Sequence, residues 1–185
     1  MELNKAIKER RSVRSFSTKK VNWRDIIEAI DAARLAPLAG NIPTLKFVVV
    51  SDKSKIAQLA EACQENFVNE VNYVIVICSV PEQCVRSYGE RGKIYARQQA
   101  GAAIENFLLK ITDLGLASVW IGAFYDEQVK RILKITGDAD IEAIFPIGYE
   151  LGKSKQKIKP NIDAVLYFNE WKNKKMEKLK KPEAF

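Results

Sequence analysis

Residues 73–80 read YVIVICSV, a nearly continuous apolar run that ends at Pro81. A run of this length, bounded by a proline, is typical of a buried β-strand that is covered on both faces. The run is far too short to cross a lipid bilayer as a helix. We therefore predict that a buried strand lies at the centre of the fold.

The segments on both sides of this strand alternate between helical and extended patterns. Asn22 is a candidate N-cap for a helix that stops near Pro37, and Gly115 is placed to end a long helix that begins near Gly92. Apolar periodicity predicts two more helices, at 56–67 and 126–133, and four more strands, at 45–50, 117–121, 141–149 and 164–168. This order indicates an α/β or α+β fold, in which helices cover both faces of a sheet. The last strand follows a charged connection, so we expect it to pair with another subunit.

The charge of the chain is concentrated near its carboxyl end. The 185 residues carry a formal net charge of +7, but residues 153–185 hold ten lysines and four acidic residues, which leaves only +1 for residues 1–152. A lysine-rich end is usually a solvated surface, so nucleic-acid binding is the less favoured interpretation. The first residues, MELNKAIKER, contain no apolar signal region, and we expect a cytoplasmic protein that does not bind membranes.

Several kinds of chemistry are excluded by composition. The sequence has no histidine, which rules out Ser-His-Asp and Cys-His hydrolases and His-ligated zinc enzymes. Neither of the two common glycine-rich nucleotide loops is present. Cys63, Cys78 and Cys84 lack the spacing of a metal or redox site, so we expect free thiols and no metal. The chemistry must therefore come from Lys, Arg, Tyr, carboxylates or a bound cofactor.

A cluster of cations lies near the amino terminus. Arg10, Arg11 and Arg14 surround Ser12 within five positions. One interpretation is a solvated helix end that the helix dipole favours. The other is an anion site, because guanidinium groups bind phosphate with two parallel hydrogen bonds and the serine hydroxyl adds a donor. Composition alone leaves both interpretations open.

Four groups of motifs, taken in order, resemble those of the nitroreductase family, the FMN-dependent NAD(P)H oxidoreductases. They are RRSVRSF at 10–16, APLAGN at 36–41 followed by the strand 47–50, NFLL at 106–109 with LGLASVWIG at 114–122, and IGY at 147–149. The resemblance implies a single FMN-binding domain over residues 1–185 with an α+β, nitroreductase-like fold and a central mixed sheet. It also implies a homodimer with FMN at the interface, in which residues 153–185 extend around the partner subunit and add a strand to it.

The resemblance assigns expected roles to individual residues. Arg10 and Ser12 would bind the FMN phosphate with Arg11 beside them, and Arg14 would face the N1/O2 edge of the flavin, where a cation stabilises the reduced ring. The other expected cofactor contacts are Leu38, Ala39, Asn41, the backbone of Ile121 and Gly122, and Lys157 or Lys159. Tyr88 and Tyr95 are candidates for aromatic walls over the substrate face.

The implied mechanism is ping-pong. NADH or NADPH would pass a hydride to flavin N5 and leave, and a nitroaromatic, quinone or similar acceptor would then bind in the same place. No catalytic side chain is required, so the lack of histidine is compatible with this chemistry. Two alternatives stay open: a flavin-binding protein of the same fold with little reductase turnover, and a basic nucleic-acid-binding module.

The chain departs from the family pattern at several positions. Leu38 and Ala39 stand where serine is frequent, the segment 43–45 replaces a frequent Gln-Pro-Trp, and Gln99 stands where aspartate is frequent. Near the carboxyl end, Ile158 interrupts a segment that commonly reads Lys-Pro-Arg. These differences make the hydroxyl contacts of the flavin and the last phosphate contact the least specified parts of the expected site.

Overall fold

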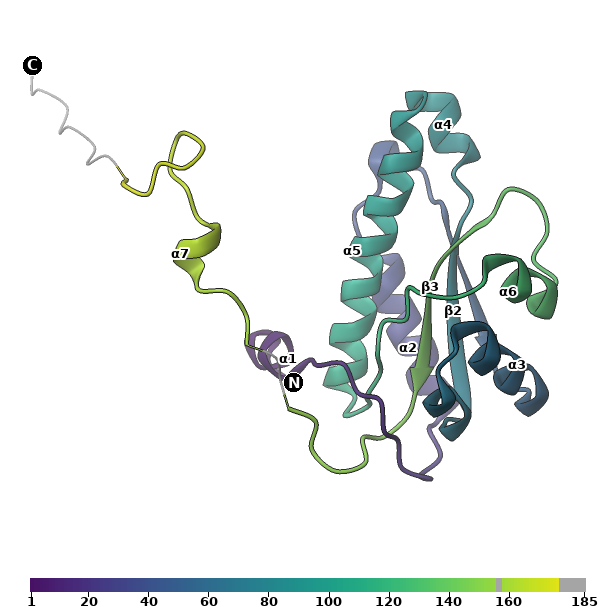
Figure 1. The fold of residues 1–185 in the computed structure, drawn as a ribbon. Coiled ribbons are helices and arrows are strands. Elements are labelled where there is room, and N and C mark those ends of the chain that lie inside the picture. Colours follow the sequence, from purple (N-terminus) through teal and green to yellow (C-terminus); the bar gives the residue numbers. More distant parts are fainter. Residues whose placement is uncertain (156–157, 177–185) are drawn as a thin grey trace, which may run out of the picture. The chain divides into compact units, whose positions relative to one another are not determined.

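The computed structural model describes residues 1–155 and 158–176, and the chain divides into two units, Met1–Lys155 and Gln156–Phe185. Figure 1 shows the elements in chain order. They are α1 (Leu3–Glu9), α2 (Trp23–Arg34), η1 (Ala39–Asn41), β1 (Leu45–Val50), α3 (Lys53–Cys63), η2 (Asn66–Glu70), β2 (Tyr73–Ser79), α4 (Glu82–Tyr88), α5 (Arg91–Asp113), α6 (Asp126–Leu133), β3 (Asp140–Ile147) and α7 (Ile162–Val165).

The sheet of the first unit is built around β2, as its apolar run predicts. Both neighbours, β1 and β3, pair with it in antiparallel fashion, with Phe47 opposite Ile77 and Ile75 opposite Phe145. Successive side chains of a strand point to opposite faces. Accordingly Ile75 and Ile77 join one core cluster, whereas Val74 and Val76 join the other.

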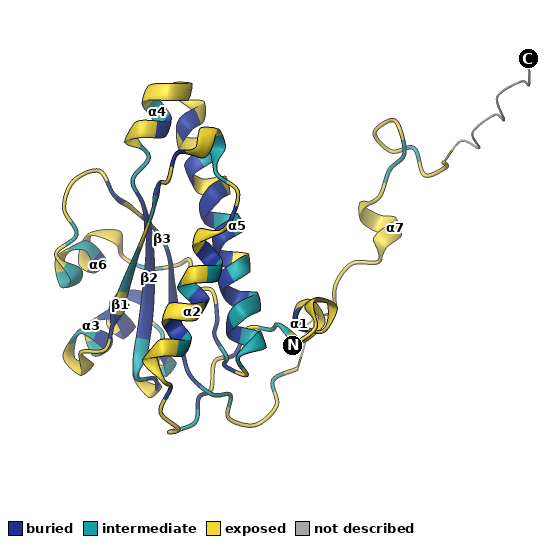
Figure 2. Cartoon of the chain, turned by 180° about the vertical axis from the view of Figure 1, so that it is seen from behind, coloured by how far each residue is buried: buried dark blue, intermediate teal, exposed yellow. Residues whose placement is uncertain are grey.

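Helices cover both faces of this sheet, which confirms the predicted layers. One layer is made by α2 and α5, and the other by α3 and α6 (Figures 1 and 2). The Asn22 side chain caps α2 by accepting a hydrogen bond from the Arg24 N–H at 3.1 Å, as predicted. On α5 the buried side includes Ala100 and Ala103, small residues that allow α2 to approach closely.

Three local predictions are corrected by the structure, and one helix was missed. The helix expected over 56–67 ends at Cys63, because Gln64 takes a left-handed conformation (φ 55°) and the chain continues as η2. The segment 117–121 makes isolated bridges, Ala117 with Gly148 and Ile121 with Ile144, instead of a continuous strand. The helix expected at 126–133 has those bounds, but Asp126, the residue expected to cap it, is its first helical residue, and the preceding residue occupies the cap position. The short helix α4 was not expected, because only its Cys84 is fully buried and it shows no apolar stripe.

The second unit contains no strand over its described residues 158–176. The strand expected at 164–168 is wrong for the single chain. Asn161 caps α7 by accepting a hydrogen bond from the Asp163 N–H at 3.2 Å, which starts a helical turn at Ile162. A strand is stable only with a partner for its backbone groups, and a single chain offers none here.

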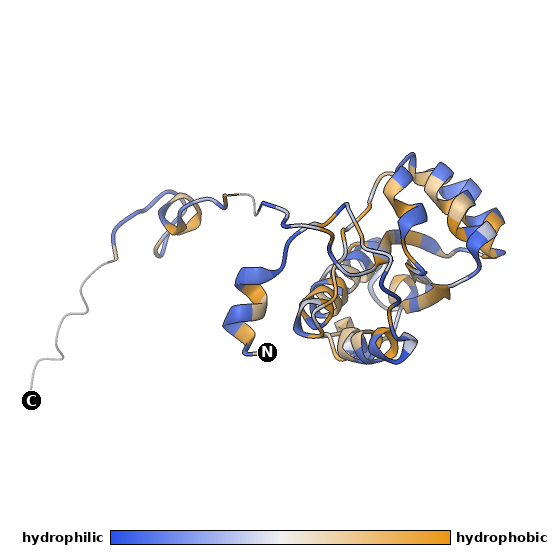
Figure 3. Ribbon diagram, turned by 90° about the horizontal axis from the view of Figure 1, so that it is seen from below, coloured by the Kyte–Doolittle hydropathy of each residue, from blue (hydrophilic) through white to orange (hydrophobic). Residues whose placement is uncertain are grey.

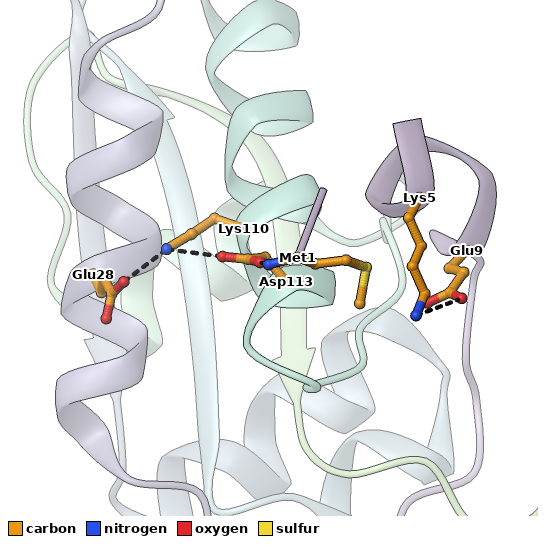
Figure 4. Close-up of polar contacts among 6 residues, drawn as sticks. All are labelled: Met1, Lys5, Glu9, Glu28, Lys110 and Asp113. Atoms are coloured by element: carbon orange, nitrogen blue, oxygen red, sulfur yellow. Dashed lines mark hydrogen bonds and ion pairs between the residues drawn. The ribbon is translucent and has the colours of Figure 1, made fainter. Parts of the chain in front are cut away.

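Helix α1 is fastened to the end of α5 by an ion-pair network (Figure 4). Lys110 Nζ lies 2.7 Å from Glu28 Oε1 on α2 and 3.0 Å from Asp113 Oδ2, and the amino group of Met1 also contacts Asp113. Hydrogen bonds to Glu28 and then to Asp113 raise the pKa of Lys110, and those from the amino terminus and from Lys110 lower the pKa of Asp113. This network fixes the start of the segment that carries the arginines.

The apolar side of α1 is left uncovered in the single chain. Leu3 and Ile7 are 64% and 50% exposed, and only Ala6 of this helix is buried. Figure 3 shows the hydrophobic and hydrophilic residues of α1 beside each other on the short helix at the amino terminus.

Candidate functional site

The segment that follows α1 runs extended across the end of the sheet. Val13 N–H donates to Ser118 O at 2.9 Å, in a parallel bridge of Ser12 with Ser118, and Phe16 bridges Glu150 in antiparallel fashion. Val13 and Phe16 are buried and anchor the segment in the core. Because side chains alternate along an extended chain, Ser12 and Arg14 face outward and are exposed.

Arg10 and Arg11 do not extend freely into solvent, so the structure disfavours the solvated helix end. Arg10 follows the last residue of α1, and its Nε lies 3.2 Å from Glu105 Oε1 on α5. Arg11 pairs with Glu150, with its Nε 3.3 Å from Glu150 Oε1 and its Nη2 close to the other carboxylate oxygen. By contrast, Arg14 has no hydrogen bond or ion pair within the described part of the chain.

Glu150 holds the arginine segment in place through its charge. Burial alone would raise the pKa of this carboxyl. Hydrogen bonds from Arg11 and from the Ser154 N–H, the latter at 2.6 Å, outweigh burial and lower the pKa instead. Glu150 is therefore ionised at neutral pH and neutralises Arg11 locally.

A pocket of about 180 Å³ opens between this segment and the carboxyl end of α5. Arg10, Arg11 and Ser118 contribute polar groups to its lining, next to apolar side chains such as Leu108 and Ile111. Within the described chain, Ser118 Oγ is buried without a hydrogen-bond partner, and the buried Arg10 Nε forms an ion pair with Glu105 at 3.2 Å but no hydrogen bond of good geometry. A buried donor without a well-formed hydrogen bond is costly, so these two atoms fit a site that receives an oxyanion such as phosphate. Ser118 was missed by the sequence analysis, because nothing in its local sequence distinguishes it from a core serine.

Ile121 and Gly122, which are expected at the flavin ring, lie in the segment beside β3. Ile121 is buried and exchanges hydrogen bonds with Ile144 at 3.1 and 3.0 Å, while Gly122 beyond it is exposed. Ser118 of the same segment makes the isolated parallel bridge with Ser12, two residues before the exposed Arg14.

Leu38, Ala39 and Asn41 lie elsewhere, in the loop that forms η1. Leu38 and Ala39 line a second pocket of about 260 Å³ together with Tyr95, Gln98 and Gln99 of α5. The first pocket involves Leu108, Ile111 and Thr112 of the same helix, so the linings of the two pockets are separated by six residues, or about 9 Å along the helix axis, at their nearest point. The two groups of predicted cofactor residues therefore line different pockets of the chain.

Tyr88 and Tyr95 lie beside the second pocket. Their rings make an edge-to-face contact with centroids 5.2 Å apart. Tyr95 lines the pocket, and the Tyr88 hydroxyl lies against Gly40 in the loop. Of the two expected lysine contacts, Lys159 is exposed in the second unit, and Lys157 lies outside the described residues.

The three cysteines are free and buried, as predicted. Burial, with Glu65 nearby, raises the pKa of Cys63 to about 12, and burial, with Glu142 nearby, raises the pKa of Cys78 to about 11. Over residues 1–155 and 158–176 no group of His, Cys, Asp or Glu side chains is arranged to hold a metal ion. No helix in the same residues is long and apolar enough to cross a membrane.

Several known proteins of similar sequence and structure are named as nitroreductases or as members of that family. A model of the Nitroreductase family matches residues 7–73 and 64–149. An Archaeoglobus fulgidus protein named "Putative NADH dehydrogenase/NAD(P)H nitroreductase" is 31% identical over 148 residues, which cover 79% of this chain and 82% of that protein. A nitroreductase family protein from Clostridium novyi superposes with a TM-score of 0.75 at 28% identity, covering 94% of this chain and 96% of the other.

More distant structures share the fold. The Vibrio harveyi NADPH:FMN oxidoreductase, solved in complex with NAD+, superposes with a TM-score of 0.83 at 18% identity, covering 92% of this chain and 78% of that one. The family match spans most of the ordered first unit, including both the arginine segment and the η1 loop. The chain therefore belongs to the Nitroreductase family.

Proposed function

We propose that this protein is an FMN-dependent oxidoreductase that takes a hydride from NADH or NADPH and delivers it to a small acceptor such as a nitroaromatic or a quinone. Family membership supports the reaction class. Two fold relatives support the cofactor: the Vibrio harveyi NADPH:FMN oxidoreductase and an iodotyrosine deiodinase solved with FMN bound. The observation that carries the proposal is the docked arginine segment beside a pocket in which Ser118 Oγ is buried without a hydrogen-bond partner within the described chain and Arg10 Nε has only an ion pair with the half-exposed Glu105.

The residues at this segment fit the phosphate end of FMN. Arg10 would bind the phosphate, with Ser118 Oγ offering a buried hydroxyl in the pocket that both line. The exposed Ser12 would add its hydroxyl from outside that lining, and Arg11, paired with Glu150, would lie beside them. The contact expected from Lys159 stays a prediction from the sequence, and Lys157 lies outside the described residues. Arg10 would exchange its contact with Glu105, which is 49% exposed and free to move into water.

Arg14 is the residue of this chain that would adjust the reduction potential of the bound cofactor. Bound FMN would supply a ring that accepts and releases a hydride. A fixed guanidinium near N1 would favour the reduced, negatively charged ring and raise its reduction potential. Arg14 is suited to that role, because no other group of the described chain holds its charge.

We further propose that the active site is completed by a second copy of the chain. The η1 loop and the arginine segment line two different pockets along α5, and neither of these two pockets is lined by both. Exposed apolar side chains on α1 and α2, Leu3, Ile7, Trp23 and Ile27, fit a surface that a partner covers. Leu38, Ala39 and Asn41 of one subunit would then meet Arg14, Ile121 and Gly122 of the other. Residues 153–185 would extend around the partner.

The visible spectrum of the purified protein, with FMN added, tests this proposal. We expect a flavin spectrum that bleaches on anaerobic addition of NADH or NADPH and returns with a quinone, in protein that elutes as a dimer. Parallel double-reciprocal plots would support the ping-pong order. Protein that stays colourless in excess FMN would overturn the proposal, and a flavin spectrum that neither nicotinamide bleaches would favour a binding protein with little turnover.

A further inference from the structure

The loop 38–41 has an uncommon backbone conformation that must be held by its surroundings. Gly40 and Asn41 both have positive φ, 58° and 57°, and two consecutive left-handed residues are disfavoured for L-amino acids. Glycine accepts this conformation at no steric cost, but asparagine does so less readily. The loop lies at the second pocket, through Leu38 and Ala39.

Gln99 of α5 holds this loop from the inside. Its side chain is 3% exposed. With the amide oriented so that every group is satisfied, Nε2 donates to Ile42 O at 3.1 Å and to Thr44 Oγ1 at 3.2 Å, and Oε1 accepts from the Ala39 N–H at 3.2 Å. The opposite orientation would set the amide oxygen against the Ile42 carbonyl oxygen, so the hydrogen-bond network selects the first.

Tyr88 covers the same loop from the other side. A Cβ placed on Gly40 would overlap the Tyr88 hydroxyl, so this position accepts only glycine while Tyr88 stays in place. The Tyr88 ring is in turn supported by its edge-to-face contact with Tyr95 on α5. The loop is therefore enclosed between a buried amide and an aromatic ring.

From these contacts we infer that Gln99 is a positioning residue that sets the shape of the 38–41 loop, and through it the affinity for FMN. The inference rests on the proposed function, because FMN is the ligand that the loop would receive. It also explains why this chain carries an amide at a position where the family resemblance leads one to expect aspartate. The site offers one backbone donor, Ala39 N–H, and one backbone acceptor, Ile42 O, and a neutral amide matches both, whereas an ionised carboxylate matches only the donor.

Two variants, Gln99→Glu and Gln99→Leu, distinguish the positioning of the 38–41 loop by hydrogen bonds from a contribution of Gln99 to packing alone. A buried carboxyl has a raised pKa, and in its protonated form it can donate to Ile42 O and accept from the Ala39 N–H, so it lacks only the second donor of the amide. Gln99→Glu should therefore resemble the wild type at low pH and lose the hydrogen bond to Ile42 O at high pH, whereas Gln99→Leu lacks both contacts at every pH. The titratable groups described around position 99 are the Cys84 thiol on α4, 3.5 Å from the amide head, and the phenols of Tyr88 and Tyr95.

The first measurement needs no cofactor. Hydrogen exchange of the Ala39 amide in the FMN-free protein should be faster by about tenfold or more in Gln99→Leu than in the wild type, because its acceptor is lost. Gln128→Leu and Gln128→Glu, made at an exposed glutamine of α6, are the matched controls and should exchange as the wild type does. Equal exchange in Gln99→Leu and the wild type would overturn the inference.

The second measurement is FMN titration by fluorescence quenching between pH 5.5 and 8.5. We expect the Kd of Gln99→Leu to be weaker by about tenfold at every pH, and that of Gln99→Glu to approach the wild-type value at the acid end only. The wild-type curve at each pH corrects for the titration of the FMN phosphate itself. A pH dependence of Gln99→Glu that follows the wild type would overturn the inference while leaving the proposed function intact. Failure of the wild type to bind FMN would overturn both.

Discussion

Replacing Glu150 by glutamine should destabilise the protein by removing the charge that anchors the arginine segment. Glu150 accepts hydrogen bonds from Arg11 Nε at 3.3 Å, from Arg11 Nη2 and from the Ser154 N–H at 2.6 Å. The two side chains of the pair are 15% and 31% exposed, so solvent screens the pair only in part. Glutamine keeps one acceptor but not the charge, and a charge-assisted bond of this kind contributes about 2 kcal/mol. For a chain of this size that corresponds to a melting temperature lower by about 4–8 °C.

The pH dependence of this effect has a defined sign. The pKa of Glu150 is lower in the folded protein than its ordinary value of 4.5, so the stabilisation is complete above that value and is lost as the pH falls through the folded pKa. Wild type and Glu150→Gln should therefore differ most at pH 7 and converge at an acid pH below the folded pKa of Glu150. Glu61→Gln, at an exposed position on α3, is the matched control and should change the free energy of unfolding by less than about 0.5 kcal/mol.

Urea and thermal unfolding of the FMN-free protein at both pH values measure these differences. The reasoning is refuted if Glu150→Gln unfolds like Glu61→Gln at pH 7. It is equally refuted if the gap between Glu150→Gln and the wild type stays the same at low pH, because the lost stability would then not be electrostatic.

Three further predictions concern the cofactor site and the core. Arg14→Ala should slow the anaerobic reduction of added FMN by NAD(P)H and lower the reduction potential of the flavin. The free energy of urea unfolding of the FMN-free protein should change by less than about 0.5 kcal/mol, because Arg14 is exposed. An unchanged rate of reduction would contradict the role assigned to Arg14. Gly40→Ala should lower the free energy of unfolding by about 1–3 kcal/mol, owing to its φ of 58° and the overlap with the Tyr88 hydroxyl. Tyr88→Phe in the same chain should recover part of that loss in urea unfolding, and no recovery would mean that the hydroxyl is not the obstacle. Cys63 and Cys78, with pKa values raised to about 12 and about 11, should react with a thiol reagent at pH 8 only after urea is added, and labelling of the native protein would show that they are not protected.

Local patterns in the sequence predicted much of the fold. The strands β1, β2 and β3 and the helices α2, α5 and α6 follow from apolar spacing and end signals, because these depend on residues a few positions apart. The helix α4 was missed because a seven-residue helix with one fully buried residue has no such pattern. The strand at 164–168 was predicted from composition, but pairing needs a second set of backbone groups that a single chain does not supply.

The candidate site was predictable in its residue types but not in its pairings. Arginines around a serine left an anion site and a solvated helix end both open, and the family resemblance favoured the anion site; the structure brings Arg10 and Arg11 to a pocket. The partner of Arg11 could not be foreseen, because Glu150 is 139 positions away in the chain. Gln99 was singled out only as a departure from the family pattern, and its contacts with the η1 loop depend on how α5 packs against that loop.

The docking of residues 12–17 against residues 118 and 149–151 has a consequence for the order in which the protein takes shape on the ribosome. The amino-terminal arginines leave the exit tunnel first, yet their backbone partners are made more than a hundred residues later, which at ordinary rates of translation is a delay of about 5–25 seconds. During that interval the basic segment is unpaired and accessible to nascent-chain binding factors. The pocket beside Arg10 and Ser118 is therefore completed only when nearly the whole first unit has been synthesised.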